Sequence, residues 1–356
     1  MGQVGVVERG ELGAYAAAWD ALVDSSPLPS PFLRSWWLEQ VGGTSPLYLL
    51  VLDGDELVGG LALDADRVRG VRRLRYLGAG PLAPDHLDLV ARPDRQGEVV
   101  ALLRRWLGRP GSRLLDLEGT VTASRLRAAL PGPVHEERAE VAPYVTLPGD
   151  AAALMARLSS RVRNTVRRTT RRLEAAGARH RVAEPADVER ALEDLRRLHT
   201  ERWEAGSGFL PSYEGFAAAV RHGVGRGEVV LHELVVGDEV IACEVDFEVA
   251  GRASFYQGGR SGAPEWRGAG TMLRAAVVAR ACDGGLTEYD LLRGDEAYKR
   301  DWADGRRPLV RLRAASGAAA RAVLLAMLAE ERARAGAAHA RHELRRVRAA
   351  RGGGAA

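Results

Sequence analysis

The strongest constraint on the fold of this chain is an order of secondary-structure signals that occurs twice. In the first half, the apolar runs 47–52 and 57–63 flank an Asp-Gly pair, which is typical of a β-hairpin. In the second half, the apolar runs 229–236 and 240–249 flank a Gly-Asp-Glu turn. We therefore expect two α/β units of similar topology, produced by an internal duplication.

A short sequence motif near the end of each half supports the duplication. Leu-Asp-Leu-Glu-Gly occupies 115–119 and Tyr-Asp-Leu-Leu-Arg-Gly occupies 289–294. Each follows a segment with helical spacing, at 94–107 and 267–282 respectively. A further strand is expected near 86–90. The two motifs therefore mark the same strand in each repeat.

The repeats define the predicted domain boundaries. We expect a first domain over residues 1–149, a second over 150–316, and an Ala/Arg-rich helical tail over 317–356. The alternative is a solvated terminal helix that frays, and we assign the tail no chemistry. The apolar residues that are placed to dock it on the body are Leu324, Leu325 and Leu328.

Composition excludes several classes of protein. The 356 residues are 46% hydrophobic, with a net charge of +4, so the chain can build real cores and is no disordered polyelectrolyte. Two cysteines, Cys243 and Cys282, provide neither a disulfide framework nor a metal cluster, and the eight histidines lack metal-ligand spacing. No signal-peptide pattern and no membrane-length apolar run occur. We therefore expect a cytoplasmic protein without a metal or a membrane span.

Residues 289–302 combine a short apolar strand, a glycine turn and a dense group of ionisable side chains. Asp290 lies in the strand, and Asp295, Tyr298 and Lys299 follow the turn. Acids can accept a proton, and a fixed cation can stabilise charge that develops on a carbonyl or phosphate oxygen. Lys299 is the only lysine of the chain, which makes it the first candidate. The alternative is a strand and a solvated helix, with Asp290 supporting the fold and Tyr298 packing the core.

Three acids alternate along the predicted strand 240–248. Glu244, Asp246 and Glu248 share one face because side chains of a strand point alternately to its two sides. One of them, with Glu244 as the candidate, could be the general base that deprotonates an acceptor amine. A solvent-facing edge strand is the alternative.

Two further segments favour the binding of anions. Residues 266–272 read Trp-Arg-Gly-Ala-Gly-Thr-Met and open a predicted helix, where glycines and free N–H groups let a phosphate approach the backbone. Residues 161–172 contain six arginines, of which Arg163, Arg167 and Arg171 share one helical face. An ordinary helix start and a solvated arginine face are the respective alternatives.

Four segments together resemble the acyltransferase family of cellulose biosynthesis, a branch of the GNAT-like superfamily that is similar to the Fem-type peptidyltransferases. They are 159–168, 199–203, 266–273 and 289–302, and they cover roughly residues 150–310. The resemblance implies tandem GNAT-like domains, each a mixed sheet flanked by helices, with the active site mainly in the second.

The resemblance also implies how the donor is held. GNAT enzymes bind the pyrophosphate of coenzyme A with an Arg/Gln-x-x-Gly-x-Gly/Ala loop, and Arg267 and Gly270 match it, together with Gly268 and Thr271 in the same loop. Met272 stands where the family has Gly or Ala. Similar departures occur in relatives that use aminoacyl-tRNA, so both donors stay open.

In Fem-like relatives, a lysine in a matching aromatic-Lys motif steadies the acyl carbonyl or a phosphate, and Lys299 after Tyr298 falls on that position. In the family, an arginine-rich helix recurs between the two halves of the protein. This resemblance favours a binding role for Arg163 and Arg167. We interpret residues 199–203 and the following segment to Phe209 as the wall on the acceptor side.

These observations predict an acyltransferase that moves an acyl group from acyl-CoA, such as acetyl-CoA, to an amine or hydroxyl by direct attack. Lys299 would offset oxyanion charge, an acid (Glu244 or Asp295) would accept the proton, and the Arg267 loop would hold the donor phosphates. The alternatives are a tRNA-dependent aminoacyl transferase of Fem type and a non-catalytic scaffold for a polyanion or partner. The acceptor, whether a small molecule, glycan or peptide, stays open.

Overall fold

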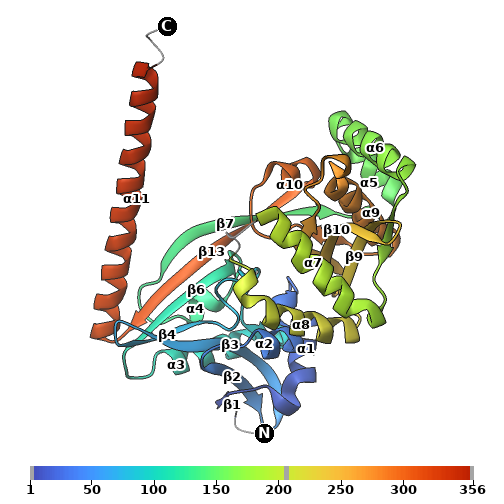
Figure 1. The fold of residues 1–356 in the computed structure, drawn as a ribbon. Helices are drawn as coiled ribbons and strands as arrows, with labels where there is room; N and C mark the ends of the chain where they lie inside the picture. Colours follow the sequence, from blue (N-terminus) through green and yellow to red (C-terminus); the bar gives the residue numbers. More distant parts are fainter. Residues whose placement is uncertain (1–3, 204–207, 353–356) are drawn as a thin grey trace.

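The computed structural model describes residues 4–203 and 208–352, and Figure 1 shows their arrangement. The elements of the first half are β1 (Val4–Arg9), α1 (Ala16–Asp24), α2 (Ser35–Val41), β2 (Pro46–Asp53), β3 (Glu56–Val68), β4 (Val71–Tyr76), β5 (Val90–Ala91), α3 (Gln96–Leu107), β6 (Arg113–Val121), α4 (Leu126–Ala129) and β7 (His135–Thr146).

The elements of the second half are α5 (Ala151–Arg157), α6 (Ser160–Ala175), β8 (Ala178–Val182), α7 (Val188–Trp203), α8 (Tyr213–Gly225), β9 (Val229–Val236), β10 (Glu239–Val249), β11 (Arg252–Arg260), α9 (Ala269–Asp283), β12 (Glu288–Asp290), α10 (Ala297–Trp302), β13 (Gly305–Ser316) and α11 (Ala318–Gly352).

The duplicated topology is confirmed. The predicted hairpins are β2–β3 and β9–β10, both antiparallel. In each half a helix then connects two parallel strands, β4 to β6 through α3 and β11 to β12 through α9. The expected strand near 86–90 is wrong, because Ala83 and His86 have positive φ and turn the backbone away from an extended course. Only the two-residue strand β5 and an isolated bridge at Leu87 form there.

The two repeats share one sheet, in the order β1-β2-β3-β4-β6-β13-β7-β12-β11-β10-β9-β8. Strand β13, which comes last in the sequence, lies between β6 and β7, whereas β7 of the first half lies against β12 of the second. The halves therefore exchange their final strands. The predicted boundaries at 149/150 and 316/317 divide the sequence, but β7 and β13 each pair with a strand of the other half.

An aromatic cluster joins the halves on one side of the sheet. Phe32 and Trp37 from the first half pack edge-on against Phe247 and Tyr256 from the second, with ring centroids 5.2–5.7 Å apart. The Tyr256 hydroxyl also donates a hydrogen bond to the Leu82 carbonyl at 2.7 Å. The other side of the second half is covered by α9, with α5 and α6 beside it (Figure 1).

Helix α11 docks through its first turns and then projects away from the body (Figure 1). Leu324 and Leu328 are buried against β4 and β6 in a small core with Leu114, as predicted, whereas Leu325 is 67% exposed. Arg313 of β13 forms an ion pair with Glu331 at 2.7 Å, which fixes the helix further. Among the described residues, none of the helices has the length and apolar character required to cross a membrane.

Candidate active site

A cavity of about 360 Å3 lies where β10, β11 and the start of α9 meet. Its ionisable lining includes Glu244, Arg274 and Tyr298, and Trp302 of α10 adds an apolar ring. The remaining lining residues are Cys243, Phe255, Gly258, Gly259, Arg260, Gly268, Gly270, Thr271 and Leu273. The cavity therefore combines residues from both predicted elements of the site, the acidic strand and the glycine loop.

The glycine loop brings the start of α9 into this cavity. Gly268 caps the helix with φ of +90°, a left-handed conformation that favours glycine. A Cβ at this position would lie 2.7 Å from Thr169 Cγ2 of α6, so a larger residue would push the loop from its place. Three of the predicted donor-binding residues, Gly268, Gly270 and Thr271, line the cavity. The first turn of a helix offers backbone N–H groups and a positive dipole end, which suits an anionic ligand.

The arginine-rich helix α6 holds this loop. Arg172 donates hydrogen bonds to the carbonyl oxygens of Glu265 and Arg267. Of the two predicted binding residues on α6, Arg163 donates to backbone carbonyls at the end of α5, whereas Arg167 is exposed to solvent. Of the α6 arginines, Arg172 thus holds the loop, Arg163 holds the end of α5, and Arg167 faces solvent.

The acids of β10 share one face of the strand, as predicted, and the structure shows that this face lies against α9. Arg280 of α9 contacts Glu248 at 2.5 Å, and Arg274 contacts Glu244 at 3.0 Å. The solvent-facing edge is excluded, because β10 pairs with β9 and β11 and both Glu244 and Asp246 are buried. Buried carboxylates need partners, which a helix arginine supplies here.

Arg274 is the centre of a buried polar cluster. Its Nη2 lies 3.0 Å from Glu244 Oε2, and its Nη1 donates to Tyr289 Oη at 2.6 Å. The Tyr289 hydroxyl donates in turn to Asp246 Oδ2 at 2.7 Å. The guanidinium also lies 3.7 Å from the Phe255 ring centroid, a cation–π contact. One cation thus fixes the position of the acid that lines the cavity.

The two carboxyl groups of the cluster, Glu244 and Asp246, differ in protonation. Burial raises the pKa of Asp246 well above its usual range, and the neighbouring Glu244 raises it further. Burial also raises the pKa of Glu244, although the charge of Arg274 opposes this shift. Since two like charges in one buried site are unfavourable, we infer that the pair shares one proton. With Arg274 the cluster is then neutral, and Glu244 keeps the negative charge beside the cavity.

Lys299 lies in a second, smaller cavity of about 210 Å3 next to the first, where β11 and β12 diverge. Its ammonium donates to the carbonyl oxygens of Leu292 and Arg293 and forms an ion pair with Glu296 at 3.1 Å. Burial lowers the pKa of Lys299, while Glu296 opposes the shift. Tyr298, its neighbour, lines both cavities, so α10 connects the lysine to the Glu244 site.

The other two predicted acids do not line the Glu244 cavity. Asp290 is fully buried and lies 2.8 Å from His86 Nε2, with Arg252 at 3.2 Å. Burial acts to raise the pKa of Asp290, but His86 and Arg252 lower it overall. Asp295 is exposed and paired with Arg300 at 3.2 Å. The structure therefore places Asp290 as a link between the halves and Asp295 on a surface turn.

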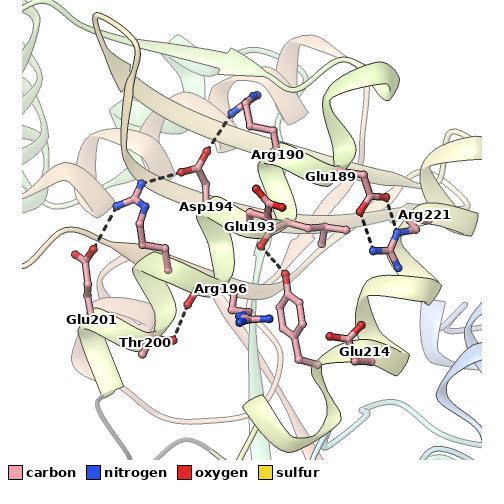
Figure 2. Close-up of a pocket in the computed structure, with 12 residues that line it drawn as sticks. Glu189, Arg190, Glu193, Asp194, Arg196, Thr200, Glu201, Glu214 and Arg221 are labelled. Atoms are coloured by element: carbon pink, nitrogen blue, oxygen red, sulfur yellow. Dashed lines mark hydrogen bonds and ion pairs between the residues drawn. The ribbon is translucent and has the colours of Figure 1, made fainter.

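A larger cavity, about 890 Å3, is a charged groove between α7 and α8 (Figure 2). Its side chains are largely engaged with one another: Arg221 holds Glu189 at 2.6 Å, and Arg190 holds Asp194 at 3.1 Å. None of the predicted catalytic or donor-binding residues lines it. The predicted acceptor wall lies at the end of α7, where buried His199 packs 4.9 Å from the Phe209 ring. The intervening residues 204–207 lie outside the described residues.

In the described part of the first half, the start of α3 carries no glycine loop like the one before α9. Helix α3 begins after Arg95, and the arginines before it are paired: Arg92 with Asp94 at 2.8 Å and Arg95 with Glu98 at 2.6 Å. Among the described residues, no three His, Cys, Asp or Glu side chains are grouped to hold a metal ion. The geometry suited to an anionic donor therefore lies in the second half.

Sequence reasoning missed two members of the cluster, Arg274 and Tyr289. Arg274 lies among the apolar residues of α9, and the sequence contains many other arginines that need no special role. The available signal was a cation next to Leu273 on a helix that faces the core. Tyr289 was assigned only to the strand. Its role depends on β12 lying next to β11 and not far from β10, which is a long-range feature.

Comparison with known proteins agrees with this description. Residues 160–300 match the family model described as an acetyltransferase (GNAT) domain. The sequence matches none of the curated proteins compared with it. The narrower resemblance to the cellulose-biosynthesis branch stays a prediction.

Solved structures with the same fold span nearly the whole chain. FemX aligns with a TM-score of 0.62 at 11% identity, covering 83% of this chain and 95% of its own. A domain from Agrobacterium fabrum named for lysylphosphatidylglycerol synthetase aligns with a TM-score of 0.58 at 14% identity, covering 88% and 95%. The L-PGS structure from Bacillus licheniformis follows with 0.54 at 12% identity, covering 84% and 91%.

The chain has a tandem GNAT-like α/β fold, followed by the helix α11, as predicted. The segment that matches the acetyltransferase domain runs from α6 into α10 and contains the glycine loop, the Glu244 cluster and Lys299.

Proposed function

We propose that the protein is an acyltransferase that moves an acyl group from acyl-CoA to an amine, or less readily a hydroxyl, by direct attack within the cavity between β10 and α9. The observation that carries the proposal is the meeting of two features in one cavity of about 360 Å3. A glycine-capped helix start suits the phosphates of the donor, and a buried carboxylate held by Arg274 suits proton removal from the acceptor.

Glu244 is the proposed general base. The acceptor ammonium loses one N–H proton to the Glu244 carboxylate, and the free amine attacks the acyl carbonyl. The thiol of coenzyme A leaves, so the products are the amide, the thiol and one proton. Arg274 Nη2 lies 3.0 Å from Glu244 Oε2 and holds this carboxylate in place. Glu244 keeps the negative charge because Asp246 retains the proton that the two carboxyl groups share.

The donor side of the site uses the loop before α9. The backbone N–H groups of Gly268 and Gly270 would receive the pyrophosphate, and the exposed Arg267 would add a charge to it. Thr271 lines the same cavity, although its own N–H donates to the Gly268 carbonyl at 2.9 Å. Met272 is buried and points into the core under α9, so it occupies no space in the donor cavity. The departure from the family pattern at this position is thus compatible with a coenzyme A donor.

Lys299 and Tyr298 are proposed to act on the acyl carbonyl. Tyr298 lies at the border of both cavities. Lys299 lines the second cavity, and it would approach a developing oxyanion after giving up its ion pair with Glu296, which is half exposed. The two backbone carbonyls that Lys299 also contacts keep the ammonium in position.

A binding titration with acetyl-CoA tests the donor assignment. We expect micromolar binding by the wild type and at least tenfold weaker binding by Arg267→Ala, because a charge-assisted phosphate contact contributes roughly 1.5–3 kcal/mol. Arg321→Ala is the matched control, since Arg321 is exposed on α11, far along the chain from the loop. Equal affinities for all three proteins, or no binding, would contradict the assignment.

Aminoacyl transfer from charged tRNA is the second candidate. It is favoured by the exposed arginines of α6, Arg167 and Arg171, which lie on the same helix as Arg172, the residue that holds the donor loop. Binding of charged tRNA that weakens steeply with salt, in the absence of acetyl-CoA binding, would support it. Binding of neither donor would favour a scaffold role.

A further inference from the structure

A row of histidines continues the buried cluster away from the cavity. His232 of β9 stands opposite Glu244 in the β9–β10 register, and its Nε2 lies 4.0 Å from Asp246 Oδ2. Its Nδ1 lies 3.1 Å from Nε2 of His180 on β8, and the two rings stack with centroids 5.3 Å apart. Asp246, His232 and His180 therefore form a line across three neighbouring strands.

The line connects, through Tyr289, to Glu244 in the cavity at one end, and it reaches His180 near solvent at the other. Glu244 lines the cavity, and its Oε1 lies 3.4 Å from Tyr289 Oη, which contacts Asp246. His232 is fully buried, whereas His180 is half-buried on β8, the last strand of the sheet. The path thus runs beneath α9 from the acid in the cavity to the sheet edge.

Two atoms in the line lack hydrogen-bond partners within the described part of the chain. They are His232 Nε2 and Asp246 Oδ1, both fully buried. A buried polar atom without a partner is costly, so its retention calls for an explanation. The 4.0 Å separation of His232 Nε2 from the Asp246 carboxyl closes to hydrogen-bond distance with a shift of about 1 Å. The unpartnered His232 Nε2 is therefore placed to accept a proton from the Asp246 carboxyl.

The charges around His232 keep it neutral. Burial lowers its pKa well below the usual range, and His180, Arg280 and Arg274 lower it further. The Arg280 charge is itself balanced by Glu248 at 2.5 Å, and Asp246 is the acid that faces His232 from β10. A neutral imidazole can accept a proton on one nitrogen and release one from the other.

We propose that Tyr289, Asp246, His232 and His180 form a proton exit path that carries the proton taken up by Glu244 from the cavity to the sheet edge. This proposal rests on the proposed function, since it assigns the route by which the acyl-transfer proton leaves. It adds relay residues on β8 and β9 to the site, none of which contacts the substrates.

The number of protons balances along the path. Glu244 passes its new proton to Tyr289 Oη while the Tyr289 hydroxyl proton passes to Asp246. Asp246 gives a proton to His232 Nε2, and His232 releases its Nδ1 proton to His180, which loses one to water. One proton leaves the protein for each ammonium deprotonated, and Glu244 is again a carboxylate. His232 then returns to its first tautomer by proton exchange.

The test follows thiol release from acetyl-CoA with a panel of primary amines (tyramine, spermidine, glucosamine and a glycyl peptide), at low buffer and with added imidazole. For His180→Ala and the milder His180→Gln, we expect kcat at low buffer to fall at least about tenfold, with an unchanged KM for acetyl-CoA. Imidazole restores kcat because it can replace the missing terminal relay group. His232→Phe loses kcat without such rescue, since its site is buried.

His222→Ala is the matched control, because His222 is an exposed histidine on α8. We expect it to keep the wild-type kcat at every buffer concentration. Wild-type kcat at low buffer in both His180 variants and in His232→Phe would overturn the exit path while leaving the acyltransferase intact. A loss in the His180 variants that imidazole does not restore would overturn it as well, since it would indicate a structural role. A wild type that binds no acyl donor would overturn the proposed function and the path together.

Discussion

Arg274 Nη2 on α9 lies 3.0 Å from Glu244 Oε2 on β10, and both side chains are buried at the edge of the cavity. This ion pair joins the helix that begins at the glycine loop to the strand that carries the acid. A change at either partner is expected to affect proton transfer and helix position together, and the following predictions separate the two.

Glu244→Gln should remove proton transfer and keep donor binding. We expect kcat to fall about 10²–10⁴-fold, the usual contribution of a positioned base, with an unchanged dissociation constant for acetyl-CoA. Since the pKa of Glu244 is raised by burial, wild-type activity should fall as pH drops through that raised value, and the variant should lose this limb of the profile. Full activity of Glu244→Gln with a wild-type pH profile would rule out this base.

Gly268→Ala should weaken donor binding by displacing the loop. The new methyl group meets Thr169 Cγ2 at 2.7 Å, and alanine at a φ of +90° is strained by about 1–3 kcal/mol. The double variant Gly268→Ala, Thr169→Ser removes the close methyl contact but keeps the backbone strain. We expect it to recover part of the affinity for acetyl-CoA in a titration. An affinity equal to wild type in the single variant would show that the loop is not part of the donor site.

Lys299→Met should lower both activity and stability. Loss of an oxyanion-stabilising donor typically costs about 10²–10³-fold in kcat. The carbonyls of Leu292 and Arg293 also lose their donor, so the melting temperature should fall. Glu296→Gln is the companion variant: it frees the ammonium from its ion pair and should keep kcat at or above wild type. A folded Lys299→Met protein with wild-type kcat would assign the lysine to the fold alone.

Asp88 provides a pH-dependent stability prediction in the first half. Burial raises its pKa from 3.8 to about 6, although hydrogen bonds from Ser124 and the Leu89 N–H oppose the shift. Because the folded value exceeds the unfolded one, the stabilising contribution is complete below about pH 4 and is lost as pH rises through about 6. Urea unfolding at pH 5 and pH 8 should show a smaller pH effect for Asp88→Asn than for wild type, and an equal effect would contradict the shift.

Local signals predicted the hairpins, the helices and the glycine loop, because Asp-Gly turns and helical spacing are encoded within a few residues. The alternation of Glu244, Asp246 and Glu248 also predicted which face they share. The exchange of β7 and β13 could not be foreseen, since it depends on pairings between segments more than 150 residues apart. Asp290 shows the same limit: its partner His86 comes from the other half, so its linking position follows only from the assembled sheet.

The most direct test of the central claim is hydrogen–deuterium exchange of the backbone with and without acetyl-CoA. We expect protection of residues 266–272 at the start of α9, the proposed binding site of the donor phosphates, and no change at the start of α3 near residues 93–98. Protection confined to the α3 segment, or no protection of 266–272 at a saturating donor concentration, would contradict an acyl-donor site between β10 and α9.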